Sequence, residues 1–547
     1  MMFAFRSALA AAVFSLCVCE NLFAENNDPA SAALSKLIDQ KIDAANQDSN
    51  LTPAPLATDA VIIRRTTLDL AGRIPTVAEV RAYLEDPAPD KRRELVERLL
   101  NSPDFAFHQA NWFDETLMSE NRADDKWLQY LRSAAAEDRP WDQMFREMMV
   151  PPTDVAEDDV SQHAKTFLKK RVREPDDMAN DTSRLFFGVS INCAQCHDHP
   201  LVEDWKQDHY FGFKSFFART FLTKSDKLAE KFEAEVKFKT TAGEDKQAKM
   251  MFLTGDTVDE PKVEKTKEVR EAEKKLIQQA TKEKDAELPR PDFRPREQLV
   301  QVALKPDNQH FLAKSIVNRV WSRFFGHGLV HPLDQMHSEN PANHPEILAA
   351  ATQYLIDNGY HLKPLIREIV LSDAYARSSQ WRDEKPPYVD RFAMGQTRVL
   401  SPRQYAISLI IATSAASRFP LDMPAEEWAK QRLNLEKQSY SLANELELPT
   451  EHFQVSVDEA LLFNNSSRIQ NDLLRTSNDR LVGQMRSQDS PIEQVTTAFW
   501  NVYGREPNPD ELAACREYLE SRSDRTDAAI QQLVWALITS PELRFNY

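Results

Sequence analysis

The chain has 547 residues, with 85 acidic side chains against 68 basic ones and a formal net charge of −17. Hydrophobic residues make up 42% and charged residues 28%, a composition that excludes disordered and fibrous proteins and indicates a globular one. The acidic balance argues against a nucleic-acid-binding protein, which would need a basic surface. Only 11 residues are glycine and helix-forming residues are abundant, so we expect a mainly α, multi-helical fold.

Residues 1–24 have the pattern of a secretory signal peptide. Arg6 precedes an apolar stretch, Ala8–Val18, and Ala24 stands at the expected cleavage point. We therefore expect an exported protein, periplasmic or extracellular, and the alternative interpretation is a buried N-terminal helix. No later apolar run approaches the ~20 residues that cross a bilayer, so no transmembrane span is expected.

Helix signals in the remaining chain predict two helical domains, 25–222 and 291–547, with a charged insert at 223–290 between them. In the first domain, Thr76 followed three positions later by Glu79 predicts a capping box at a helix start. Such a box satisfies backbone N–H groups that have no partner within the helix, so it marks the start of a helix.

The insert and the second domain carry their own signals. Val236–Lys239 alternates in polarity and Met251–Leu253 follows after Gly243, so these two stretches predict a small β hairpin. Lys265–Leu288 predicts a charged helix or linker. Further on, Gly326 is a plausible helix stop, and Ser401–Gln404 combines a capping residue, a proline and a glutamine that together indicate a helix start.

Two stretches near opposite ends of the chain share one layout. Gly72–Val80 matches Gly504–Leu512, and Leu99–Pro103 matches Leu537–Pro541. A repeated helical hairpin explains the match, and unrelated helices with similar end signals explain it equally well. Both interpretations stay open from the sequence.

The chemistry is concentrated in a C-x-x-C-H motif, which is the attachment signature of c-type haem. Cys193 and Cys196 are three positions apart, so both thiols can face one side of a helical turn and form thioethers with the haem vinyl groups. His197 would then lie under the iron as an axial ligand. The sequence therefore predicts covalent haem c on these three residues, in keeping with export.

Other interpretations of the motif remain open. The two cysteines with His197 or His199 could instead bind zinc or non-haem iron. A metal-dependent hydrolase or oxidoreductase would use His197, Asp198 and His199, together with Asp208 and His209. A redox disulfide or a purely structural loop is the third interpretation.

The second axial ligand of a haem at this motif is not apparent. His199 lies two residues after His197 and so does not share its helix face, which argues against it as the second ligand of the same iron. Further candidates, each more often a packing or surface residue, are His163, Met178, His209, Met250 and Met251. An aromatic stretch after the motif predicts either a helical core or the wall of a haem crevice: Trp205, Tyr210, Phe211, Phe213, Phe216 and Phe217.

Four more histidines are close in sequence within the second domain: His327, His331, His337 and His344. They form a metal site or, as is commoner, serve packing and hydrogen bonding. Cys515 lies on an apolar helical stripe and is expected to be a small buried residue. No G-x-S-x-G, Walker A or dinucleotide-binding pattern occurs in the chain, so no reaction can be assigned from such motifs.

Two groups of motifs resemble a known pair of domains. Arg64–Thr76 and Cys193–Pro200 resemble the planctomycete-specific cytochrome-like domain of unknown function (PSCyt type). Val317–Trp321, Phe325–Val330 and His344–Leu348 resemble its companion, the planctomycete-specific C-terminal domain (PSD type). The resemblance covers nearly the whole chain after the signal and implies an exported haem-binding protein of unassigned role.

From the motif and the resemblance together, we expect one covalent haem that passes single electrons to or from a redox partner protein. Many relatives begin with a separate cytochrome-c-like domain that has its own C-x-x-C-H. This chain contains one such motif, so a relay between several covalent haems within the chain is not expected. The alternative is the non-haem metal-dependent enzyme.

Overall fold

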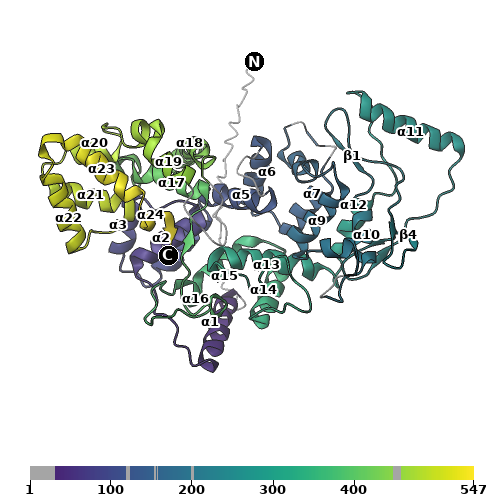
Figure 1. Cartoon of the computed structure of the whole chain (residues 1–547), viewed down its shortest axis with the longest axis horizontal. Helices are drawn as coiled ribbons and strands as arrows, with labels where there is room; N and C mark the ends of the chain where they lie inside the picture. The colour runs from purple at the N-terminus through teal and green to yellow at the C-terminus, as the bar shows by residue number, and fades with distance from the viewer. Residues whose placement is uncertain (1–30, 119–123, 153–154, 157, 199–201, 447–456) are drawn as a thin grey trace, which may run out of the picture.

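The structure is a computed structural model of the chain. It describes residues 31–118, 124–152, 155–156, 158–198, 202–446 and 457–547. The expected signal peptide, residues 1–24, lies outside the described residues. As predicted, the described chain is mainly α-helical, and its strands form only two-stranded sheets (Figure 1).

The first part of the chain is built from helices that precede the insert. They are α1 (Ser31–Asp48), α2 (Asp59–Ala71), α3 (Val77–Glu85), α4 (Lys91–Leu100), α5 (Pro103–Met118), α6 (Asp125–Ala136), α7 (Trp141–Met149), α8 (Thr166–Lys169), α9 (Pro175–Phe187) and α10 (Gln207–Ser215). The 3₁₀ turn η2 (Asn192–Gln195) lies between the last two.

The charged insert, together with the three residues before it, contains three antiparallel hairpins and one helix. The strands pair as β1 (Thr220–Leu222) with β2 (Leu228–Glu230), β3 (Lys237–Lys239) with β4 (Asp245–Gln247), and β5 (Met250–Met251) with β6 (Thr257–Val258). A strand at Lys237–Lys239 is therefore confirmed, but its predicted partner is wrong, because β3 pairs with β4 while Met251 belongs to a separate hairpin with β6. The charged segment that follows forms α11 (Lys267–Lys282), which lies at the outer edge of the molecule in Figure 1.

The remaining chain is again helical, apart from a short sheet. Its helices are α12 (Pro295–Ala303), α13 (Gln309–Phe325), α14 (Pro345–Asp357), α15 (Leu362–Leu371), α16 (Asp373–Ala376), α17 (Pro402–Ala412), α18 (Ala425–Ala443), α19 (Val457–Asn465), α20 (Leu481–Arg486), α21 (Pro491–Tyr503), α22 (Pro509–Glu520), α23 (Thr526–Ile538) and α24 (Pro541–Arg544). Strand β7 (Arg398–Val399) pairs antiparallel with β8 (Phe545–Asn546).

The predicted helix ends are confirmed at several places. The hydroxyl of Thr76 accepts a hydrogen bond from the backbone N–H of Glu79 (3.2 Å), and the Glu79 carboxylate accepts one from the N–H of Thr76 (2.8 Å). Ser401 and Gln404 form the same capping box at the start of α17. Gly326 ends α13 with a φ of 77°, in the left-handed region that glycine adopts without strain.

The hydrophobic core has two parts that do not follow the order of the chain. One cluster extends from Leu34 to Phe392, so that α1 packs against α14, α15 and α16. The other extends from Leu400 to Leu543 and also takes in Leu68 from α2. The two predicted helical segments therefore share their cores. Within the described residues, no helix combines the length and the apolar character needed to cross a membrane.

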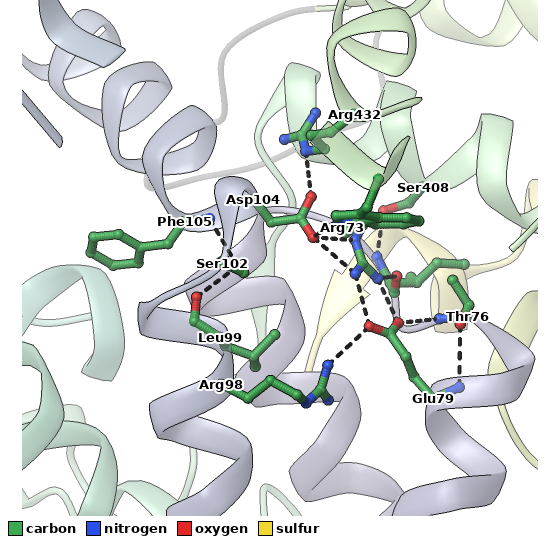
Figure 2. Close-up of polar contacts among 12 residues, drawn as sticks. Arg73, Thr76, Glu79, Arg98, Leu99, Ser102, Asp104, Phe105, Ser408 and Arg432 are labelled. Carbon is green, nitrogen blue, oxygen red and sulfur yellow. Dashed lines mark hydrogen bonds and ion pairs between the residues drawn. The ribbon is translucent and has the colours of Figure 1, made fainter. Parts of the chain in front are cut away.

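Residues of the first copy of the suspected repeat form a buried ion-pair network (Figure 2). The guanidinium of Arg73 lies 2.7 Å from the Glu79 carboxylate and 2.9 Å from that of Asp104. The second oxygen of Asp104 lies 2.6 Å from Nε of Arg432 in α18, and the indole N–H of Trp428 donates to the same carboxylate (2.9 Å). This network therefore joins α3 and α5 to a helix more than 300 positions away in the sequence.

The second copy repeats the arrangement of the first. Arg505 pairs with Glu511 (2.8 Å) and with Glu542 (2.7 Å), as Arg73 does with its two carboxylates. The glycine before each arginine ends a helix in the left-handed region, with φ of 68° at Gly72 and 69° at Gly504. The structure thus confirms a repeated helical hairpin. The copies differ in burial, because the Arg505 side chain is 31% exposed and that of Arg73 only 2%.

The ion pairs in the first copy of the repeat, which is the buried one, predict that the folded protein loses stability in acid. Burial alone would raise the pKa of Glu79, but the charge and hydrogen bonds of Arg73 outweigh burial and lower the pKa from 4.5 to about 2. Because this pKa is lowered in the folded state, the stabilisation is complete above pH 4.5 and is lost as the pH falls towards 2. The full loss amounts to about 3 kcal/mol.

Urea unfolding at a series of pH values measures this effect. Between about pH 5 and about pH 3, the free energy of unfolding of Glu79→Gln should fall less steeply than that of the parent protein. Glu511→Gln is the matched control from the exposed copy and should change the slope little. Equal slopes for the parent and Glu79→Gln would contradict the prediction.

Helix α2 carries two buried arginines that bind backbone carbonyl groups of distant segments. Arg64 donates to the carbonyl oxygen of Glu542 (2.8 Å). Arg65 donates to those of Tyr375 (2.6 Å) and Arg377 (2.8 Å). Burying a guanidinium is costly unless its donors are satisfied, and here carbonyl oxygens of the distant segments accept from both side chains.

Asp69, one turn further along α2, accepts hydrogen bonds from three other segments. Arg398 of β7 binds both of its oxygens (2.9 and 2.7 Å), and the hydroxyl of Tyr375 donates to one of them (2.8 Å). The side-chain amide of Asn546 in β8 donates to the other (2.9 Å). Figure 1 shows α2 beside the segment from α24 to β8 that these bonds hold.

Candidate functional site

The two cysteines of the motif lie together on one turn of the surface. Cys193 is part of η2 and Cys196 follows it directly, and both thiols are free and exposed. Ala194 between them is fully buried and holds the turn against the core. The expectation that both cysteines lie on one helical turn is therefore met, with a 3₁₀ turn in place of an α-helical one.

The imidazole of His197 is exposed and oriented by its own loop. Its Nδ1 lies 2.6 Å from the carbonyl oxygen of Asp198. A carbonyl oxygen only accepts hydrogen bonds, so in the neutral ring Nδ1 carries the proton and Nε2 keeps its lone pair. Histidines that bind metals almost always show this arrangement, in which one nitrogen donates to an oxygen and the other binds the metal.

A buried glutamine holds the motif loop in place. The side-chain amide of Gln207 donates to the carbonyl oxygen of Cys196 (3.2 Å), and its oxygen accepts from the N–H of Thr241 (3.2 Å) in the β3–β4 hairpin. The backbone N–H of Gln207 donates to the carboxylate of Asp198 (2.9 Å). Sequence reasoning missed this residue, because no local pattern marks a glutamine that becomes buried.

The residues of the alternative metal site have other contacts. His199 lies outside the described residues. The carboxylate of Asp208 pairs with Lys246 (2.5 Å), and Nδ1 of His209 accepts a hydrogen bond from the backbone N–H of Lys206 (3.2 Å). Burial also lowers the pKa of His209. In the part of the chain that the structure describes, no three His, Cys, Asp or Glu side chains are grouped so that they could hold a metal ion.

The aromatic stretch after the motif belongs mostly to the core, as one of the two interpretations predicted. Tyr210, Phe213, Phe216 and Phe217 are fully buried, and Phe213 packs edge-on against Phe187. Phe211 stacks on Phe238 of β3, with ring centroids 4.2 Å apart. Trp205 differs from the others, because its buried ring lines a cavity.

The candidates for a second axial ligand lie in several places. Met178 is fully buried in α9. Met250 and Met251 form β5, which packs against α10. His163 belongs to a 3₁₀ turn next to α8, and burial lowers the pKa of its imidazole. The structure thus places these four residues within its helices and strands, on three separate elements.

The four histidines of the second helical segment do not form one group. The rings of His327 and His331 stack with centroids 4.2 Å apart. His344 lies 3.3 Å from the carbonyl oxygen of Asp390. His337 lies apart from these contacts, with its ring edge-on to that of Trp205 at 6.2 Å. These contacts fit packing and hydrogen-bonding roles.

Both sides of the motif loop are attached to one short segment, residues 334–338. Before the motif, the backbone N–H of Ser190 donates to the carbonyl oxygen of Asp334 (2.9 Å). After the motif, the Asp204 carboxylate accepts from the N–H of Ser338 (2.9 Å). The loop that carries the cysteines is therefore positioned by contacts with the second helical segment as well as by contacts within the first.

Comparisons with known proteins identify two families. The family model PSCyt2, described as a protein of unknown function (DUF1549), matches residues 37–221. The family model PSD1, described as a protein of unknown function (DUF1553), matches residues 295–519. No curated protein and no solved structure matches the chain. The motif loop thus lies in the first match, and the segment that holds it lies in the second.

Proposed function

This chain joins a PSCyt2 domain to a PSD1 domain, both of unknown function, and for this pair we propose an exported protein that carries one covalent haem c and passes single electrons to or from a redox partner protein. One observation carries the proposal. Two free cysteines, both exposed, lie on one turn directly before a histidine whose Nδ1 is 2.6 Å from a carbonyl oxygen, which leaves Nε2 of the neutral ring to bind a metal.

Each residue of the motif has a distinct task in this function. Cys193 and Cys196 would hold the haem by thioether bonds, and Nε2 of His197 would ligate the iron. The hydrogen bond from His197 to the carbonyl of Asp198 fixes the ring orientation and makes the imidazole a stronger ligand. The haem supplies a one-electron couple. The exposure of the loop leaves this side of the protein open to a partner.

A haem stain after denaturing electrophoresis, together with a pyridine haemochrome spectrum, tests the proposal. The protein should be expressed with its full sequence in a host that matures c-type cytochromes. We expect a c-type spectrum and a stained band, and both should be lost in the double variant Cys193→Ala/Cys196→Ala. Cys515→Ala is the matched control and should keep its haem, because this half-buried cysteine lies in α22.

The same preparation distinguishes the alternative function. A colourless protein from that host would contradict the haem proposal. If it then contained zinc or iron in a fixed ratio to protein, measured by elemental analysis, the non-haem metal enzyme would be supported. Loss of that metal in His197→Ala would assign the metal to the motif.

A further inference from the structure

A cavity of about 850 Å³ lies where the charged insert meets α7 and α12. Its walls come from the end of α7, from the 3₁₀ turn η1 (Val160–Lys165), from β2 and from the chain that leads into α12. The volume falls within the range of small-molecule sites, about 300–1,000 Å³. Residues 227–230 and 288–292 of the lining lie between the two family matches, so the insert supplies a wall that neither family model covers.

A buried ion pair fixes one wall of the cavity. Arg296, which is 6% exposed, donates to the carboxylate of Glu230 (3.2 Å) and to the carbonyl oxygen of Met149 at the end of α7 (2.7 Å). These bonds join α12, β2 and α7, so the wall is built on rigid elements, as a binding site requires. Arg294 and Glu297 form a second ion pair in the lining. Both pairs are neutral overall, so the other lining residues set the net charge of the cavity.

The remaining charged side chains of the lining are mostly cations. They are Lys165, Lys227, Arg290 and Asp292, which makes three cations against one carboxylate. Neither lysine forms an ion pair with any residue in the part of the chain that the structure describes. The chain as a whole has a formal net charge of −17, so an excess of cations at one cavity runs against its average composition.

Lys165 lies among like charges. Its side chain is half-buried, and burial lowers the pKa of the ammonium group, as do the charges of Lys169, Lys126 and Lys227. Asp226 opposes this shift, but its carboxylate is paired with Lys169. Holding cations together without a carboxylate between them costs free energy, and an anion bound between them removes that cost.

We propose that this cavity binds an organic oxyanion, whose negative oxygen atoms are held by Lys165 and Lys227. A lysine ammonium group acts as a point charge towards carboxylate, sulfate and phosphate oxygens, so the lining recognises the oxyanion and accepts any of these groups. The apolar body of the ligand packs against the proline rings and aliphatic side chains of the lining: Pro151, Pro152, Leu228, Leu288 and Pro289. This site lies apart from the haem motif and does not depend on the proposed function.

Isothermal titration calorimetry of the full-length protein at constant ionic strength tests the site. The probes are acetate, benzoate, inorganic phosphate and phenyl phosphate, and sodium chloride is the control for ionic strength. We expect saturable binding of benzoate or phenyl phosphate, tighter than that of the matching ion without the phenyl group, because the ring is buried against the apolar lining. Tighter binding of benzoate would assign a carboxylate to the ligand, and tighter binding of phenyl phosphate would assign a tetrahedral oxyanion.

Substitution of single lysines assigns the binding to the cavity. Lys165→Met and Lys227→Met should each weaken the binding of the tighter probe by about tenfold, because each removes one charge-assisted bond to the anion. Lys126→Met is the matched control, since Lys126 is an exposed cation near Lys165 that does not line the cavity. It should change the affinity by less than about threefold. Lys227 is exposed, so its variant gives the same readout if circular dichroism shows that Lys165→Met does not fold.

Each other result overturns a specific part of the inference. No saturable binding of any of the four probes would overturn the site itself. Equal weakening in Lys126→Met and in the two cavity variants would show that the general positive charge of this region attracts anions, and would overturn the role of the cavity. Equal affinities with and without the phenyl group would overturn the apolar part of the ligand. A preparation without haem should give the same titrations, so failure of the proposed function would be seen separately by the haem stain.

Discussion

Asp104→Ala is expected to lower the free energy of unfolding by about 3–5 kcal/mol. The Asp104 carboxylate is 1% exposed and lies between the guanidinium groups of Arg73 and Arg432. These two side chains are themselves 2% and 0% exposed. Removing the carboxylate leaves two buried cations with one negative partner fewer, and burying a charge without a partner costs more than the pair itself stabilises.

The repeat supplies the control for this experiment. Glu542→Ala removes the corresponding carboxylate from Arg505, whose side chain is 31% exposed, so water can replace the lost partner. We expect a cost of about 1 kcal/mol or less, measured by urea unfolding under the same conditions. Similar losses in the two variants would show that burial does not set the strength of these networks.

Asp69→Ala is the second substitution with a large expected effect, again about 3–5 kcal/mol. The side chain is 3% exposed and accepts four hydrogen bonds, two from Arg398 and one each from Tyr375 and Asn546. Since these partners come from the segments that hold α2 against the second domain, the loss should also loosen the contact between the domains.

Chemical unfolding combined with limited proteolysis measures both consequences. Asp69→Ala should unfold at lower denaturant concentration, and cleavage should become faster in the segment around β7 and β8. Asp373→Ala is the matched control, because its carboxylate is 65% exposed and its ion pair with Arg92 is worth at most about 1 kcal/mol. Unchanged proteolysis in Asp69→Ala would show that α2 is held by its arginines alone.

Local signals in the sequence predicted local structure well. The capping boxes that begin at Thr76 and Ser401 and the strand β3 lie as expected, because each depends on residues only a few positions apart. The partner of β3 is β4, nearer in the chain than the predicted partner at Met251. The haem motif is equally local, and its two exposed thiols and adjacent imidazole have the accessibility that the pattern requires. Covalent haem itself remains a prediction.

Contacts between distant segments could not be read from the sequence. The pairing of Asp104 with Arg432 spans more than 300 positions, and so does the hydrogen bond from Asn111 to Glu436. The link between Ser190 and Asp334 is made by backbone atoms, which leave no trace in the residue types. For the same reason the cavity that Trp205 lines has no sequence signature, because its other walls come from residues more than 100 positions away, such as His310 and Met336.

The structure explains the first motif of the family resemblance, Arg64–Thr76. Arg64, Arg65 and Asp69 belong to this motif. In the structure their side chains are buried and bind carbonyl groups and side chains of the second domain. The motif therefore keeps two domains together, and its chemistry is used in packing.

The bond between Arg64 and the carbonyl of Glu542 sets the order of events during biosynthesis. It joins residues 478 positions apart, so it forms only after almost all of the described chain has been synthesised. Contacts of such long range are formed late and slowly. Until then α2 lacks its partners and the first domain is unfinished. A chain that stops before Glu542 would therefore leave the buried guanidinium of Arg64 without this acceptor.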